Sequence, residues 1–160
     1  MTTTNSAATL TMPSERELVI TRVFDAPPKL VWEAMTNPDH LKHWYGWRTM
    51  TMSVCEIDLR PGGVWRYGIR DTEGHEFVFS GEYREVVPPE RLVSTEGWEA
   101  MPGHEYVVTV TFEEEDGKTR MTSHLLYQNG ADRDGHLQSG MEAGMQESYV
   151  RLDEHLATMQ

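Results

Sequence analysis

Residue types that often carry chemistry in small proteins are sparse in this sequence. It has seven histidines among 160 residues. Only His40 and His43 are close together, three residues apart in a short segment with helical periodicity, which places both on one side of a helix. No third ligand follows at the spacing of a zinc site. We therefore interpret them as solvated helix residues and predict that the protein holds no metal.

The sequence also lacks the short motifs that mark common catalytic and cofactor sites. It has no nucleophile-elbow glycine pattern, no phosphate-binding loop and no dinucleotide fingerprint. The run Arg60–Gly63 reads as a turn between strands, because the helix that those motifs need does not follow it. Cys55 is the single cysteine, which excludes an internal disulfide, and we interpret it as a small buried hydrophobic residue. We predict no catalytic residue and no cofactor.

Three hydroxyl groups remain as polar candidates for an internal site. Tyr67, Tyr83 and Ser123 lie in segments with strand character and alternate with apolar neighbours on the expected inner face. Their hydroxyls could orient a ligand or act on a proton. A buried tyrosine hydroxyl usually bonds a nearby acceptor instead, and spacing identifies no acid or base with a shifted pKa. We therefore discount catalysis.

A long helix near the end of the chain is the main element that must position such groups. From Asp132 to Met159 apolar residues recur at steps of three or four, with charged residues between them. Asp132 or Asp134 could cap its start, and Ser139 with Glu142 has the spacing of a second, internal capping box. We predict one helix that buries its apolar stripe against a sheet.

The remaining segments predict that sheet and two short helices. A first strand over Arg16–Phe24 is followed by helices over Lys29–Met35 and His40–Trp44, the second capped by Asn37. Six further strands are expected over Met50–Leu59, Trp65–Arg70, Phe77–Arg84, Arg91–Thr95, Tyr106–Phe112 and Lys118–Tyr127. We predict a flexible leader over residues 1–14 and one α+β domain over residues 15–160.

Strand parity predicts which side chains face inward. The parity of Met50–Leu59 changes midway, which indicates a bulge. Arg66 and Arg70 should point outward, as surface charges pairing with Glu82 or Glu85, and His124 should also lie outside.

Five local strings then indicate a relationship to a known family. They are "FDAPPKLVWEAMTNPDHLKHWYG", "EIDLRPGGVWRY", "GEYREVVPPERLVSTEGW", "VTVTFEEEDGKTRMTSHLLY" and "GMEAGMQESYVRLDEHL". Together they resemble the START-like superfamily, in the branch related to the carboxy-terminal domain of the Hsp90 ATPase activator. The resemblance implies a helix-grip fold, a curved antiparallel sheet of six to seven strands wrapped around a long C-terminal helix. Tyr45–Trp47 departs from the family's usual aromatic and proline pattern, at the expected cavity entrance.

The resemblance also implies a cavity between the sheet and the long helix, which members of the superfamily use for apolar small molecules and some use for catalysis. Parity and the helix stripe select an aromatic and methionine-rich candidate lining. Its members are Trp44, Trp47, Trp65, Tyr67, Phe77, Phe79, Tyr83, Val108, Val110, Met121, Ser123, Met141, Met145 and Tyr149. The alternative is that these residues only fill the core.

Charge and composition limit the classes of partner that we expect this protein to bind. The net charge of −12 disfavours binding to nucleic acid or an anionic membrane surface. No signal peptide or apolar run of membrane-spanning length is present, so we expect a cytoplasmic protein. The leading hypothesis is non-catalytic binding of an apolar or aromatic small molecule, lipid- or polyketide-like. The alternatives are a protein-interaction role with an Hsp90-like partner and a cyclase- or dehydratase-like enzyme, and an edge strand could also support a homodimer.

Overall fold

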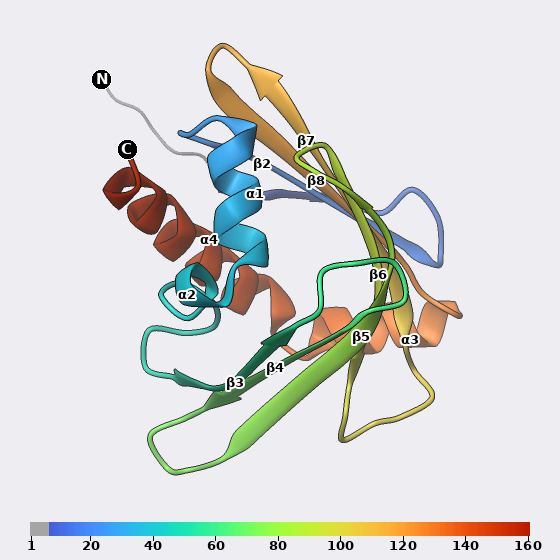
Figure 1. Ribbon diagram of the computed structural model, residues 1–160. Helices are drawn as coiled ribbons and strands as arrows, with labels where there is room; N and C mark the ends of the chain where they lie inside the picture. Colours follow the sequence, from blue (N-terminus) through green and yellow to red (C-terminus); the bar gives the residue numbers. More distant parts are fainter. Residues whose placement is uncertain (1–6) are drawn as a thin grey trace.

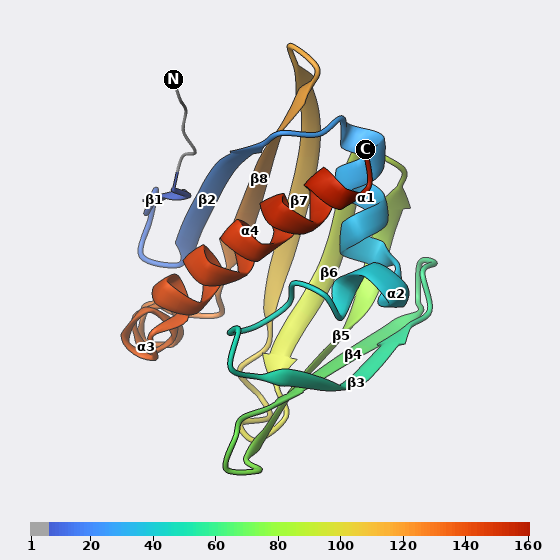
Figure 2. The ribbon, with the colours of Figure 1, turned by 90° about the vertical axis from the view of Figure 1, so that its left-hand side faces the viewer.

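The computed structural model describes residues 7–160, and these form one open antiparallel sheet with helices on its concave side (Figures 1 and 2). The strands lie in the order β1-β2-β8-β7-β6-β5-β4-β3. Their bounds are β1 Thr9–Thr11, β2 Glu17–Phe24, β3 Thr51–Ile57, β4 Val64–Arg70, β5 Glu76–Val87, β6 Arg91–Trp98, β7 Tyr106–Glu115 and β8 Lys118–Leu126. The helices are α1 Pro28–Thr36, α2 Pro38–Leu41, α3 Gly130–Gln138 and α4 Met141–Thr158.

The predicted α+β class and its element order are confirmed, but the sheet has eight strands rather than six or seven. The additional strand is β1, inside the segment we expected to be a leader. It is only three residues long, and it joins the sheet because Ala8 is buried and Leu10 packs on the cluster that contains Leu18 and Ile20. Residues 1–6 of the expected leader lie outside the described residues.

The single long helix predicted from Asp132 to Met159 is wrong, because the chain breaks between α3 and α4. Gly140 has φ +87°, a left-handed conformation that glycine adopts without steric cost and that no α-helix can continue through. The start of α3 is capped by neither predicted aspartate. The Asn129 side chain instead accepts a hydrogen bond from the Asp132 backbone N–H at 2.8 Å.

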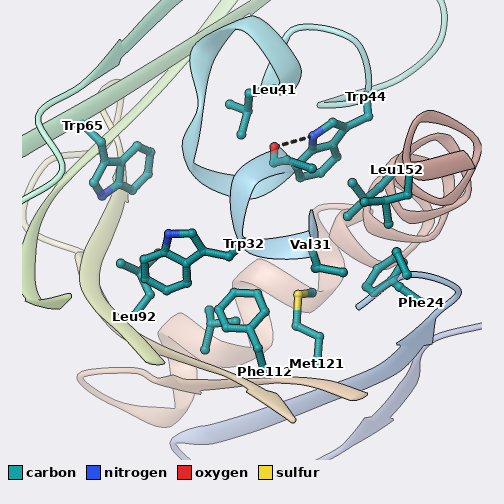
Figure 3. Close-up of a cluster of buried hydrophobic side chains, with 14 of the residues drawn as sticks. Phe24, Val31, Trp32, Leu41, Trp44, Trp65, Leu92, Phe112, Met121 and Leu152 are labelled. Atoms are coloured by element: carbon teal, nitrogen blue, oxygen red, sulfur yellow. Dashed lines mark hydrogen bonds between the residues drawn. The ribbon is translucent and has the colours of Figure 1, made fainter. Parts of the chain in front are cut away.

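The main core lies where α1 and α4 cover the sheet (Figure 3). Figure 2 shows α4 crossing the concave face diagonally, with α1 and α2 beside its C-terminal half. Leu152 and Leu156 of α4 are fully buried against Phe24 of β2 and Val31 of α1. Arg22 crosses the same interface, where its Nη1 donates to the Tyr149 carbonyl at 2.7 Å and a second nitrogen lies 3.8 Å from Asp153. This interface anchors α4 and leaves α3 free of buried residues.

Several local predictions from the sequence can be compared directly with the structure. The bulge in β3 is confirmed by a register shift between Met52 and Val54. His124 is on the outer side and pairs with Glu17 at 2.6 Å. The predicted partners of Arg66 and Arg70 are wrong, since these residues pair with Glu99 and Glu76, which the hairpins bring closer. Within residues 7–160, no helix is both long and apolar enough to cross a membrane.

Candidate functional site

A pocket of about 600 Å³ lies at the end of the sheet that α1 leaves uncovered. Its walls come from β4 to β7, from the loop after α2, and from α3 with the first turn of α4. The described lining is mainly apolar. It consists of Trp47, Met50, Ile69, Phe77, Phe79, Trp98, Met101, His104, Tyr106, Tyr127, Ala131, Asp132, Gly135, His136, Ser139, Gly140, Met141 and Gly144.

Four of the fourteen candidate cavity residues lie on this wall: Trp47, Phe77, Phe79 and Met141. The other ten lie in or against the packed interior. They are Trp44, Trp65, Tyr67, Tyr83, Val108, Val110, Met121, Ser123, Met145 and Tyr149. Parity distinguishes the inner face of a strand from its outer face. It does not show that helices α1 and α4 pack on one end of that inner face, whereas the other end lines the pocket. Trp44 follows α2 and belongs to the covering layer itself, where its indole nitrogen donates to the Ala34 carbonyl of α1 at 3.0 Å (Figure 3).

The three predicted polar candidates pair with neighbours instead of facing the pocket. Tyr67 and Tyr83 hydrogen-bond each other, and Ser123 bonds Tyr149. Burial raises the pKa of Tyr83 to about 12 and that of Tyr149 to about 12. Both tyrosine side chains are therefore neutral at physiological pH, and both are hydrogen-bonded to neighbouring side chains.

Two hydrogen-bonded pairs lie at the pocket wall, which Tyr106, Tyr127 and His136 line. The Tyr106 hydroxyl donates to the Glu96 carboxyl at 2.5 Å, and the Tyr127 hydroxyl lies 2.6 Å from Nδ1 of His136. The Tyr106 and Tyr127 rings are 4.8 Å apart, so the pairs lie side by side. Burial raises the pKa of Glu96, which the bond from Tyr106 partly opposes. Burial also lowers the pKa of His136 to about 4, so its imidazole is neutral at pH 7.

Glu96 is a candidate that the sequence interpretation missed, because the expected strand ended at Thr95. The observed β6 continues to Trp98, and its inner positions Leu92, Ser94 and Glu96 pair with Val110, Val108 and Tyr106. Glu96 is half-buried, because part of its surface is accessible to solvent. Its pKa is nevertheless raised by the protein atoms that surround the carboxyl. Glu96 does not itself line the pocket but accepts the hydroxyl of Tyr106, which does. Continuing the alternation by one step was the signal that could have found it.

Helix α3 contributes two further groups that were not predicted as site residues. Asp132 and His136 are one turn apart and both line the pocket. Oδ1 of Asp132 lies 2.9 Å from Nδ1 of His104. Its Oδ2 is the one buried side-chain oxygen or nitrogen in residues 7–160 that has no hydrogen-bond partner. An unsatisfied buried oxygen is unfavourable, and this sets Asp132 apart from the other polar residues of the wall.

Two other groups of titratable side chains lie outside the pocket. His40, which was expected to be solvated, is half-buried, with its Nδ1 2.9 Å from Nε2 of His155; the exposed His43 stacks on the same ring. Asp71, Glu73 and His75 have potential ligand atoms within 4.8 Å of one another. That arrangement follows from the hairpin, because Asp71 Oδ1 accepts the backbone N–H groups of Glu73 and His75.

His136 makes the stability of the protein depend on pH. A histidine whose pKa is lowered on folding stabilises fully above its unfolded value of about 6.5, and this contribution is lost as pH falls toward the folded value. We expect a loss of roughly 1–2 kcal/mol from this residue between pH 7 and 5, visible as a lower Tm. Glu96 acts in the opposite direction, because its raised pKa favours the protonated form in the folded state.

Comparison with His136→Phe isolates the histidine, since the phenylalanine keeps a ring but does not titrate. The Tm of this variant should fall less between pH 7 and 5 than that of the unmodified protein. Parallel pH profiles of the two proteins would contradict the assignment.

The curved antiparallel sheet, the helix lying across it and the pocket between them define a helix-grip domain of the START-like class. The family model described as "Activator of Hsp90 ATPase homolog 1-like protein" matches residues 25–157. The chain therefore belongs to this family, as its five sequence strings indicated.

Solved structures with this fold come from several bacteria. A protein from Rhodobacter sphaeroides is 28% identical with a TM-score of 0.89, over 96% of this chain and 99% of its own. A protein from Nitrosomonas europaea is 28% identical with a TM-score of 0.82, over 92% and 98% of the two chains. The AHSA1 protein from Silicibacter pomeroyi, 23% identical with a TM-score of 0.74 over 90% and 99%, shares the fold. No curated protein matches the chain.

Proposed function

We propose that this protein binds an apolar or aromatic small molecule, lipid- or polyketide-like, in the pocket between the sheet, α3 and the start of α4. The observation that supports this is a hollow of about 600 Å³ with a mainly apolar wall. Ligand pockets of drug-sized molecules range from roughly 300 to 1,000 Å³ and combine apolar walls with a few polar groups. The hollow is open to solvent beside the exposed lining residues Trp98 and Met101, so a molecule of this size can enter it.

Native mass spectrometry of freshly purified protein, followed by extraction, tests this proposal. We expect a co-purifying compound of defined mass, or a thermal shift with members of an apolar and aromatic library. Trp98 lines the pocket but is 39% exposed, so Trp98→Glu should fold and bind roughly tenfold or more weakly through loss of apolar contact. Val64→Glu is the matched control, because Val64 is 57% exposed and outside the pocket. A clean apo mass with no thermal shift would remove the proposal.

A second candidate is catalysis on the bound molecule, of the cyclase or dehydratase kind. Glu96 favours it, because a carboxyl with a raised pKa beside a tyrosine hydroxyl is suited to general acid–base work. Two results would favour catalysis over simple binding: the extracted compound is converted over time, and Glu96→Gln abolishes this conversion without preventing binding.

A protein-partner role is the remaining proposal. It is supported by the family description, which refers to an activator of the Hsp90 ATPase. The sheet is also open, and its edge strands β1 and β3 could pair with a second copy in a homodimer. An apo protein that captures the host's Hsp90 homologue would favour this alternative over small-molecule binding.

A further inference from the structure

The described pocket lining contains a carboxylate but no lysine or arginine. This carboxylate belongs to Asp132. Of the two lining histidines, His136 is neutral at pH 7 and His104 is already hydrogen-bonded to Asp132. A carboxylate or phosphate ligand would therefore enter without a cationic partner, and the net charge of −12 adds to the repulsion.

Asp132 has an accepting capacity that the protein leaves unused. His104 occupies Oδ1, while Oδ2 is shielded from solvent and has no partner in residues 7–160. Asp132 lines the pocket, and each carboxylate oxygen has more than one lone pair, so a donor in the pocket can bond this side chain without displacing His104. An ionised carboxylate accepts several hydrogen bonds, and those from a charged donor are the strongest.

The rest of the wall suits a positive charge as well. Trp47, Trp98, Tyr106 and Tyr127 are lining residues whose rings can attract a cation. Aromatic faces combined with a carboxylate are the usual means by which proteins recognise an ammonium group in a site with little water.

We propose that the ligand is an apolar molecule that carries a protonated amine, with its hydrocarbon part against the aromatic wall and its ammonium group at Asp132. This inference rests on the proposed function, because it specifies the chemical class of the small molecule that the pocket binds. It distinguishes the protein from carriers of fatty acids and other anionic amphiphiles.

Three probes with one hydrocarbon body test the proposal by isothermal titration calorimetry. They are 4-phenylbutylamine, 4-phenylbutan-1-ol and 4-phenylbutyrate, all at pH 7.5 in 150 mM salt. We expect the amine to bind roughly tenfold more tightly than the alcohol, and the carboxylate to bind most weakly. Asp132→Asn should weaken the amine roughly tenfold while changing the alcohol less than about twofold.

Asp134→Asn is the matched control on the same helix. Asp134 is 54% exposed in its side chain, pairs with Arg133 and does not line the pocket, so this change should leave all three affinities unaltered. Equal binding of the three probes, or tighter binding of the carboxylate, would overturn the amine assignment while leaving the proposed function standing. Failure of all three probes, together with a clean apo mass, would overturn both.

Discussion

Replacing Leu152 with alanine is expected to lower the free energy of unfolding by roughly 3–5 kcal/mol. Leu152 is fully buried in the cluster between α4, α1 and the sheet, close to Phe24 and Val31 (Figure 3). The deleted methyl groups would leave a void, because α4 is held in place by Leu156 and by the Arg22 bond to the Tyr149 carbonyl. Urea unfolding followed by circular dichroism measures the loss.

Val150→Ala provides the matched control on the same helix. Val150 is 45% exposed, and surface changes of this kind usually remain within about 0.5 kcal/mol. If Leu152→Ala were no more destabilising than Val150→Ala, the interface between α4 and the sheet would not be the principal core of this protein.

Gly81→Ala should be at least as damaging, at roughly 3 kcal/mol or more, and should reduce the yield of folded protein. A Cβ atom at Gly81 would lie 1.8 Å from the Thr95 carbonyl oxygen and 2.7 Å from the Trp65 indole nitrogen. Gly81 is opposite Trp65 in the sheet, and its lack of a side chain lets that indole donate to Thr95 at 3.2 Å. An added methyl group must push β5 away from β6. Soluble yield and Tm together measure the effect.

Gly135→Ala, the same change in α3, should instead stabilise the protein. No atom lies within 4 Å of a Cβ at Gly135, and alanine stabilises a helix interior by roughly 0.5–1 kcal/mol relative to glycine. An increase in Tm for Gly135→Ala beside a decrease for Gly81→Ala would show that close approach of the backbone is the cause. Similar decreases for both would contradict that explanation.

Much of this fold could be predicted because the relevant signals are local. Pro28 and Asn37 start the two short helices, and alternation places Trp65 inward in β4. The break at Gly140 was missed because the apolar stripe continues across it at nearly helical spacing. Stripe periodicity reports which residues need burial, but it does not report the backbone conformation of a single glycine.

The candidate site was harder to predict because its polar groups come together only in three dimensions. Asp132 meets His104 across 28 positions of sequence, and His40 meets His155 across 115. Parity identified inner-facing aromatics such as Trp65 and Phe79, but it could not decide which of them the helices cover. Only the placement of the helices over one end of the sheet separates the core residue Trp65 from the pocket residue Phe79.

The break at Gly140 divides the carboxy-terminal region into two parts with different structural roles. Residues after it hold the core through Leu152 and Leu156, whereas α3 before it has no buried residue yet supplies Asp132 and His136 to the pocket. Substitutions at the exposed lining positions of α3, Ala131 and Gly135, can therefore alter what the pocket accepts at little expense in folding. A lineage, or a protein engineer, could diversify specificity at these positions while the remainder of the scaffold stays constant.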